Sequence, residues 1–205
     1  MNMIFFDTET TGLKPGQICQ LSYIKVTTDT KPQKVEGKNF FFSVEDIEPS
    51  AEAIHGFSVE DLIELSDGCE FSDLYEEFIN DFVDCDLVIG YNVNFDIKFL
   101  VAEFYRLGIN YIPKMDFCAM QYYKEICAIR GKNGDIKNPK LAEVVEFLNI
   151  DETFMYEKTR ELFGGSGRFH DARFDTTATY LIITEGIKKK FIPPYYFTKY
   201  IKDKK

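Results

Sequence analysis

Residues 3–12 read Met-Ile-Phe-Phe-Asp-Thr-Glu-Thr-Thr-Gly, and this stretch decides the fold of the chain. Its apolar first half is typical of a buried β-strand, and two carboxylates follow directly. Because side chains alternate between the two faces of a strand, Asp7 and Glu9 are expected on the same face. Two carboxylates so close together repel each other unless a cation lies between them. Oxygen ligands of this kind favour Mg²⁺ or Mn²⁺, so the stretch predicts a divalent metal site at a strand end.

Two more acidic segments follow along the chain. Residues 88–100 read Val-Ile-Gly-Tyr-Asn-Val-Asn-Phe-Asp-Ile-Lys-Phe-Leu and place Asp96 after an apolar strand. Residues 170–179 read His-Asp-Ala-Arg-Phe-Asp-Thr-Thr-Ala-Thr and bring Asp175 five residues after His170. A lone Asp-x-Glu at a strand end is more simply a polar entry into a turn. The two later segments favour the metal site instead.

Together these segments resemble the DEDDh exonucleases, the DnaQ-like superfamily of 3′–5′ proofreading and trimming nucleases with an RNase H-like fold. Residues 53–58, Ala-Ile-His-Gly-Phe-Ser, are similar to a further segment of that family. The resemblance covers most of the chain. It implies an α/β fold in which a mixed central sheet, an antiparallel meander plus parallel strands, is flanked by helices.

The resemblance also implies the roles of the acidic residues. Two Mg²⁺ or Mn²⁺ ions are expected at four carboxylates, those of Asp7, Glu9, Asp96 and Asp175. His170 is expected to act as a general base from the loop before the last helix, because five residues is not a same-face helical spacing to Asp175. The pKa of a histidine near working pH suits that role. The alternative for His170 is a surface histidine at a helix start.

A second group of residues is expected to bind the terminal nucleotide: Thr10, Gly12, Leu13, His55, Phe57 and Asn92. Aromatic rings bind single strands without sequence preference, which suits His55 and Phe57. The alternatives are a plain turn for residues 10–13, and helix entry with core packing for His55 and Phe57. The chain departs from the family at Tyr91, where many members have His, and this places any contact from Tyr91 to the scissile strand in doubt.

Hydrophobic periodicity and turn residues predict the elements that carry these segments. Strands are expected at residues 3–8, 17–27, 38–44 and 87–91, with the first three in an antiparallel meander. Helices are expected to start near Ser58 and Ser72, and to span residues 95–107, 117–130 and 139–148, with a long final helix through residues 174–182. Residues 1–187 are predicted to form an exonuclease domain, and residues 188–205 a basic aromatic tail.

Composition and cysteine usage narrow the class of protein. The chain has 205 residues, of which 45% are hydrophobic, and this suits one globular domain. No apolar run is long enough for a membrane span, and no signal peptide is expected before the first strand. The five cysteines form no Cys-x-x-Cys pair, so they predict reduced thiols in a cytoplasmic protein.

The charge distribution bears on the partner. The net charge is −10, but residues 188–205 hold seven lysines and one aspartate, which leaves +6 on the tail and −16 on the rest. An acidic body argues against long basic-groove binding and favours a local grip on nucleic acid 3′ ends, with single-stranded DNA as the expected substrate and RNA as the alternative. A polymerase or another replication or repair protein is a further expected partner. The tail is expected either to dock on nucleic acid or protein, or to fold back over the acidic body.

The sequence therefore predicts a metal-dependent 3′–5′ exonuclease that releases nucleoside monophosphates from single-stranded DNA by two-metal hydrolysis. An exoribonuclease that trims RNA 3′ ends is the alternative on the same scaffold. A phosphatase with Asp7 as nucleophile is disfavoured, because such an enzyme normally has Asp where this chain has Glu9. A catalytically inactive nucleic-acid-binding module is disfavoured because all four carboxylates and His170 are present.

Overall fold

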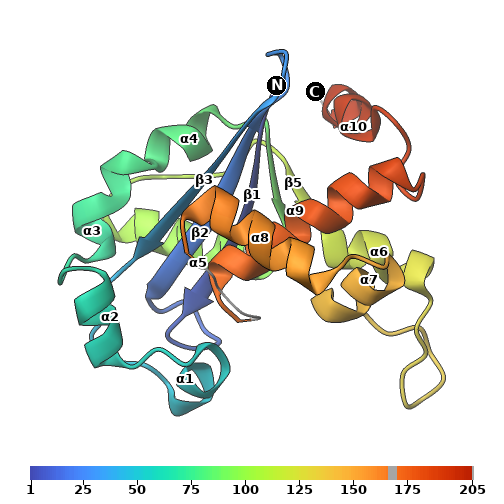
Figure 1. Ribbon diagram of the computed structural model, residues 1–205. Helices are drawn as coiled ribbons and strands as arrows, with labels where there is room; N and C mark the ends of the chain where they lie inside the picture. The colour runs from blue at the N-terminus through green and yellow to red at the C-terminus, as the bar shows by residue number, and fades with distance from the viewer. Residues whose placement is uncertain (166–169, 205) are drawn as a thin grey trace.

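The computed structural model describes residues 1–165 and 170–204. Its centre is a five-stranded sheet with helices on both faces (Figure 1). The strands lie in the order β3-β2-β1-β4-β5. Their bounds are Asn2–Thr10 (β1), Ile18–Thr27 (β2), Lys34–Phe41 (β3), Leu87–Gly90 (β4) and Asp116–Cys118 (β5). Strands β1, β2 and β3 pair antiparallel, while β4 and β5 run parallel to β1, which confirms the predicted mixed sheet.

The helices divide between the two faces of the sheet. Helices α3 (Phe71–Leu74), α4 (Ile79–Asp84) and α5 (Val93–Arg106) supply the core of one face, and α6 to α10 supply that of the other. The bounds of the second group are Ala119–Cys127 (α6), Leu141–Phe147 (α7), Glu152–Phe163 (α8), Ala172–Lys188 (α9) and Tyr196–Lys204 (α10). Three short segments complete the set, namely α1 (Pro49–His55), α2 (Val59–Leu65) and the 3₁₀ turn η1 (Tyr75–Glu77).

Strand β1 shows why both faces are covered. Ile4 and Phe6 enter the core beneath α4 and α5, whereas Met3 and Phe5 enter the core beneath α9. All four side chains are buried, as expected for a central strand with helices on both faces. The period of two then carries Asp7 and Glu9 to the α9 face.

Several element bounds differ from the sequence-based expectation. Strand β3 ends at Phe41, because Phe42 leaves the sheet to pack against Phe71 and Phe78. The segment expected as one helix from residue 117 to 130 begins within the three-residue strand β5, and its helix α6 already ends at Cys127, before Ala128 with its left-handed φ of 49°. Helix α7 begins at Leu141, two residues later than expected.

The other helical expectations had mixed outcomes. The capping box at Ser58 is confirmed, because its hydroxyl accepts from Asp61 N and the Asp61 carboxylate accepts from Ser58 N. Helix α3 begins at Phe71 after a cap at Glu70, so the expected cap at Ser72 is wrong. Helix α8 was not predicted.

The C-terminal segment folds onto the same domain. Phe197 and Ile201 of α10 are buried, and the Phe197 ring packs edge-on against Phe117 of β5 with centroids 5.1 Å apart. Tyr200 Oη donates a hydrogen bond of 2.8 Å to the Asp116 carbonyl. The tail thus packs on the apolar end of the sheet beside β5.

Within the described part of the chain, no helix combines the length and apolar character that a membrane span requires.

Candidate active site

Three carboxylates meet where β1 passes under the N-terminus of α9. Oxygens of Asp7, Glu9 and Asp175 all lie within 4.8 Å of one another. Asp7 and Glu9 share the face of β1 that α9 covers, and Asp175 lies in the first turn of α9. Contacts of α9 with both β1 and β2 hold that turn over the strand end.

Asp96 reaches the same place from the opposite side of the strand. It lies in the first turn of α5, which follows β4, and its side chain is only 3% exposed. Its Oδ1 accepts hydrogen bonds from Thr8 N at 3.1 Å and from Thr8 Oγ1 at 2.8 Å. Asp96 lines one cavity of about 270 Å³ together with Asp7, Glu9, Asp175 and His170. The structure therefore brings all four predicted carboxylates together.

Burial raises the pKa of every carboxyl group in this cavity, and repulsion between carboxylates raises those of Asp7, Glu9 and Asp175 further. Desolvation is the largest cause in each case. The pKa of Asp7 is raised well above its usual range, further by Asp96 and Asp175. That of Glu9 is raised likewise, further by Asp175. The pKa values of Asp96 and Asp175 rise to about 7.

Nothing in the described part of the chain pairs with the charge of the four carboxylates. Among the described residues, no Lys or Arg forms an ion pair with any of them. Asp175 Oδ1 is buried and accepts no hydrogen bond within the same set of residues. Hard oxygen donors with unfilled lone pairs fit a divalent cation such as Mg²⁺ or Mn²⁺.

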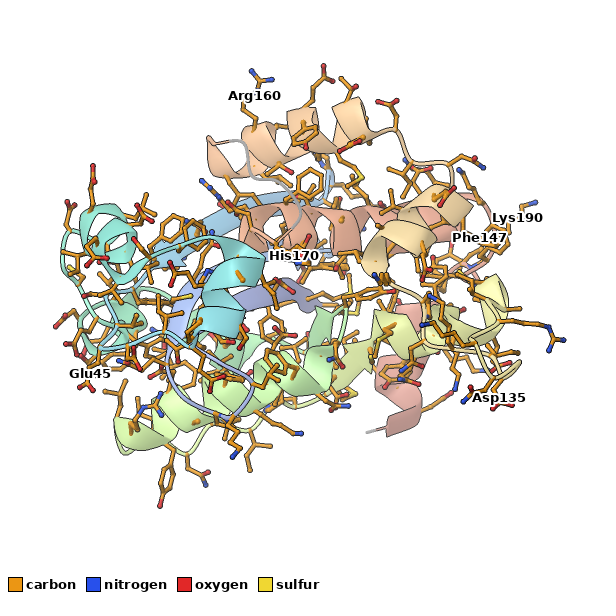
Figure 2. The ribbon with its side chains drawn as sticks, turned by 90° about the horizontal axis from the view of Figure 1, so that it is seen from below. Glu45, Asp135, Phe147, Arg160, His170 and Lys190 are labelled. Carbon is orange, nitrogen blue, oxygen red and sulfur yellow. The ribbon has the colours of Figure 1, made fainter. Side chains whose placement is uncertain are left out.

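His170 lies at the rim of this cavity. Its side chain is exposed, and its backbone N–H points to Asp175 Oδ2 at 3.4 Å (Figure 2). Its φ of 67° is left-handed, which is uncommon for a residue other than glycine. The sequence Gly-Gly-Ser-Gly at residues 164–167 predicts a mobile segment before His170, but residues 166–169 lie outside the described residues. Gly164 ends α8 with a left-handed φ of 75°.

Hydrogen bonds between four side chains fix the start of α9. We call this group the clamp; it consists of Gln20, Asn39, Asp171 and Arg173. Gln20 Nε2 donates to Asp171 Oδ1 at 3.1 Å and to Asn39 Oδ1 at 2.9 Å, while Gln20 Oε1 accepts from Ala172 N at 3.1 Å. Arg173 donates to both Asp171 oxygens, at 2.9 and 2.6 Å. Because Asp171 follows His170 directly, the clamp holds the backbone between His170 and Asp175.

Sequence reasoning missed this clamp. Gln20 is fully buried and pairs with Glu9 in the β1–β2 register. A buried amide in an apolar strand beside a metal-binding strand was the available signal, since buried polar groups require partners. Its partner Asp171 lies 151 residues away, which no local pattern reveals.

A second cavity, of about 240 Å³, adjoins the carboxylates on the α1 side. It is mostly apolar, and its walls are formed by Thr8, Glu9, Thr10, Gly12, Leu13, Ser50, Ala51, Ile54, His55 and Phe95. Leu13 is 76% exposed and Ile54 is 54% exposed, so the cavity presents unburied apolar side chains to a ligand. This apolar pocket contains four of the six residues expected to bind the terminal nucleotide.

His55 gives the apolar pocket a polar group. Its Nδ1 accepts from Phe57 N at 3.1 Å, so Nε2 carries the proton of the neutral ring. Burial lowers the His55 pKa, and an interaction with the Thr10 backbone partly offsets this. Nε2 is buried and forms no well-aligned hydrogen bond with the described residues. Phe57 lies outside the pocket, because it packs edge-on against Phe41 at 5.4 Å and stacks on His55 at 5.5 Å.

The turn after β1 shapes the other wall. Thr10 Oγ1 donates to the Gly12 carbonyl at 2.9 Å. A Cβ at Gly12 would lie 2.5 Å from the carboxylate of the exposed Glu48, so a larger residue here would displace the Glu48 side chain.

Asn92 and Tyr91 lie on the carboxylate cavity, on the side away from the apolar pocket. Asn92 is exposed, whereas the Tyr91 hydroxyl donates to the Pro139 carbonyl at 2.7 Å. The Tyr91 hydroxyl therefore ties β4 to the segment before α7.

Comparison with known proteins adds a family and a set of similar folds. The sequence profile of the exonuclease family RNase_T matches residues 4–183. No curated protein matches the sequence. Among solved structures, Escherichia coli exonuclease I in complex with a dT13 oligonucleotide is 17% identical, with a TM-score of 0.67, and the match covers 91% of this chain and 41% of that one. Exonuclease I from Methylocaldum szegediense is 15% identical, with a TM-score of 0.68, over 92% of this chain and 41% of its own. At these identities the likeness shows the fold, and the chain spans about two-fifths of the length of these relatives.

Proposed function

This chain belongs to the RNase_T exonuclease family, the DEDDh-type 3′–5′ exonucleases with an RNase H-like fold, and from that premise we propose that it shortens single-stranded DNA from the 3′ end and releases nucleoside monophosphates. One observation carries the proposal. Four carboxylates from three elements line a single cavity, and that cavity adjoins an apolar pocket with which it shares Thr8, Glu9 and Phe95.

The carboxylates suit phosphodiester hydrolysis. Asp7, Glu9, Asp96 and Asp175 would hold two divalent ions, for which Mg²⁺ or Mn²⁺ fits the oxygen donors. Such ions supply charge for the scissile phosphate and lower the pKa of water. The His170 imidazole, at the cavity rim, accepts a proton from the attacking water as a general base. The clamp on Asp171 keeps His170 and Asp175 in register for this task.

The apolar pocket suits the terminal nucleoside. Leu13 and Ile54 offer apolar surface to a base or sugar, and the His55 Nε2–H offers a donor. Asn92 lies on the opposite side of the carboxylates, where it would meet the strand rather than the terminal nucleoside. Because the pocket adjoins the carboxylates, a nucleoside bound there places its 5′ phosphate at them, which is the geometry of terminal release.

The choice of DNA as substrate, the cellular role and the location are proposed from fewer observations than the hydrolytic activity. DNA is favoured because similar structures of Escherichia coli exonuclease I are complexes with dT13 and dA16 oligonucleotides. RNA remains the alternative substrate. A proofreading or repair role beside a polymerase or another replication protein follows the resemblance to proofreading nucleases. The five free cysteines are consistent with a location in the cytoplasm.

A gel assay tests the proposed function. Single-stranded DNA and RNA of one sequence, labelled at the 5′ end, are incubated with Mg²⁺, with Mn²⁺ or with a chelator. We expect a ladder that shortens from the 3′ end on DNA, no product with chelator, and no product from Asp175→Asn. A ladder on RNA alone would replace DNA by RNA as the substrate. No product on either strand with either ion refutes the proposal.

A further inference from the structure

The connection between α6 and α7 forms a small ordered projection, which we call the basic hairpin (residues 129–140). Arg130 and Ile136 form an antiparallel bridge, and Lys137 N donates to the Ile129 carbonyl at 2.9 Å. At the tip, Gly131 N donates to the Asp135 carbonyl at 2.8 Å, and Arg130 Nη1 donates to the Gly134 carbonyl at 2.8 Å. These bonds give the projection a defined shape that a plain loop lacks.

The basic hairpin has the opposite charge to the protein as a whole. It contains Arg130, Lys132, Lys137 and Lys140 against the single acid Asp135, whereas the chain carries −10. Lys137 is paired with Glu143 at 2.6 Å. Within residues 1–165 and 170–204, Arg130, Lys132 and Lys140 form no ion pair, and all three are exposed. Their charge is available to an anionic partner.

The basic hairpin is anchored at the rim of the carboxylate cavity. The Pro139 carbonyl accepts the hydrogen bond from Tyr91, and Tyr91 lines that cavity. Leu141, which follows Lys140 directly, lines it as well. Lys140 N also donates to Glu143 at 2.6 Å, so the anchor is continuous with the first turn of α7. The positive charge therefore begins one residue from the cavity wall.

The positions of the two cavities indicate the path of a bound strand. The apolar pocket is walled by Ser50, Ala51 and Ile54 of α1, whereas Leu141 and Tyr91 lie only on the carboxylate cavity. In Figure 1, α1 lies below the end of β1, and the basic hairpin extends from the same lower end of the molecule, well to the right of α1. Figure 2 shows His170 near the centre of that end and Asp135 of the hairpin to one side. A strand with its terminal nucleoside by α1 leaves toward the hairpin.

We propose that the basic hairpin binds the backbone phosphates of the strand on the 5′ side of the cleaved linkage, an inference that rests on the proposed function. The acidic body repels a polyanion beyond the cavity, so cations placed along its exit path supply the grip that keeps a long strand bound. The contacts are to phosphate and carry no sequence preference. They also scale with the number of nucleotides that reach the hairpin.

Binding measurements with a matched control test this inference. Arg130→Gln with Lys132→Gln removes two charges from the hairpin. Lys31→Gln with Lys34→Gln removes two exposed charges from the β2–β3 turn and the first residue of β3, where Lys34 pairs with Glu36. This region lies at the other end of β1, because Lys34 is opposite Thr27 and Thr27 is opposite Asn2. The Kd of 5′-labelled DNA is measured by fluorescence anisotropy over a range of salt, with Ca²⁺ as the only divalent ion and intact DNA verified on a gel. The strands are a dinucleotide and an oligonucleotide of about a dozen nucleotides, long enough to span a site of the size that single-strand binders occupy.

We expect the hairpin variant to bind the longer strand on the order of tenfold more weakly at 0.1 M salt, with the slope of log Kd against log salt reduced by about 1.4, or 0.7 for each lost phosphate contact. The dinucleotide Kd and the control variant stay at wild-type values. An unchanged slope for the longer strand, or an equal loss in the control, overturns the inference. Equal weakening of the dinucleotide also overturns it, because the hairpin would then act on the cavity itself. If the wild-type protein binds the longer strand with the steeper salt dependence but shortens no strand, the proposed activity is refuted and the proposed binding by the hairpin is not.

Discussion

Replacement of Asp7 by Asn should stabilise the metal-free protein at pH 8. Asp7 is the carboxylate whose pKa is raised by burial and by the most acidic neighbours, and among the described residues it has no ion-pair partner. The pKa of the neighbouring Asp96 shows how large the free-energy cost of ionisation is in this cavity. A rise in the Asp96 pKa from 3.8 to about 7 corresponds to on the order of 4 kcal/mol for the ionised form. The amide removes one desolvated charge and relieves repulsion on Asp96 and Asp175. We expect a gain of about 2 kcal/mol, or roughly 4–8 °C in Tm for a chain of this size.

The sign of the pH dependence follows from the raised pKa values. A carboxyl with a raised pKa in the folded state binds more protons there than in the unfolded chain at intermediate pH. Folding stability from this site is therefore fully present below about pH 4 and is lost as the pH rises to about 7, where Asp96 and Asp175 ionise. The wild-type protein should lose stability across this window in chelator, and Asp7→Asn should lose less.

Thermal unfolding followed by circular dichroism checks both statements, with chelator present and at pH 4, 6 and 8. The control is Asp46→Asn, an exposed carboxylate outside both cavities, which should leave Tm within about 1 °C. Added Mn²⁺ should raise the wild-type Tm at pH 8, because ligands of the folded state stabilise it by mass action, and it should raise the Tm of Asp7→Asn less. A Tm for Asp7→Asn at or below wild type at pH 8, or an equal gain at pH 4 and pH 8, would refute the reasoning.

Two further predictions concern the start of α9. His170→Ala should lower kcat/KM by about 10²–10⁴-fold and remove the acidic limb of the pH–rate profile, while Mn²⁺ affinity stays within a few-fold; matching profiles in variant and wild type would exclude His170 as the base. Gln20→Leu removes one hydrogen bond to Asp171 and leaves the Ala172 N–H without its partner, so we expect on the order of 10–100-fold weaker Mn²⁺ binding by calorimetry and a fall in kcat with little change in KM. Gln33→Leu, on the exposed β2–β3 turn, is its control, and wild-type Mn²⁺ affinity in Gln20→Leu would show that the clamp is only structural.

The sequence predicted those parts of the fold that depend on strong local patterns. The apolar run of β1 with its Asp-x-Glu, the continuous apolar strand β4 and the first turn of α9 are all of this kind. Elements set by tertiary packing were missed or misplaced. Strand β5 has only three residues and pairs with β4, and an aromatic run around Phe42 concealed where β3 leaves the sheet. Helix α8 lacks a strong apolar stripe, since only Met155 and Thr159 are buried along it.

The active site also has a part that local sequence patterns predict and a part that they do not. Alternation along β1 is enough to place Asp7 and Glu9 on one face, and helical phase places Asp175 at a helix start. The contacts that hold them come from residues distant in the sequence. Thr8 meets Asp96 across 88 positions, and Gln20 meets Asp171 across 151. Such contacts depend on chain topology, for which a single sequence contains no periodic signal.

The location of the carboxylates explains their unfavourable electrostatics. On the α9 face, Met3 and Phe5 of β1 are buried in a well-packed core, and the same face continues without a break to Asp7 and Glu9. The helix that covers the core therefore also covers the acids and supplies a third carboxylate from Asp175. Burial that stabilises the apolar half of the strand raises the pKa of the acidic half. Packing of the adjoining core thus offsets the free-energy cost of burying the ionised carboxylates, and that cost should fall when a divalent ion binds.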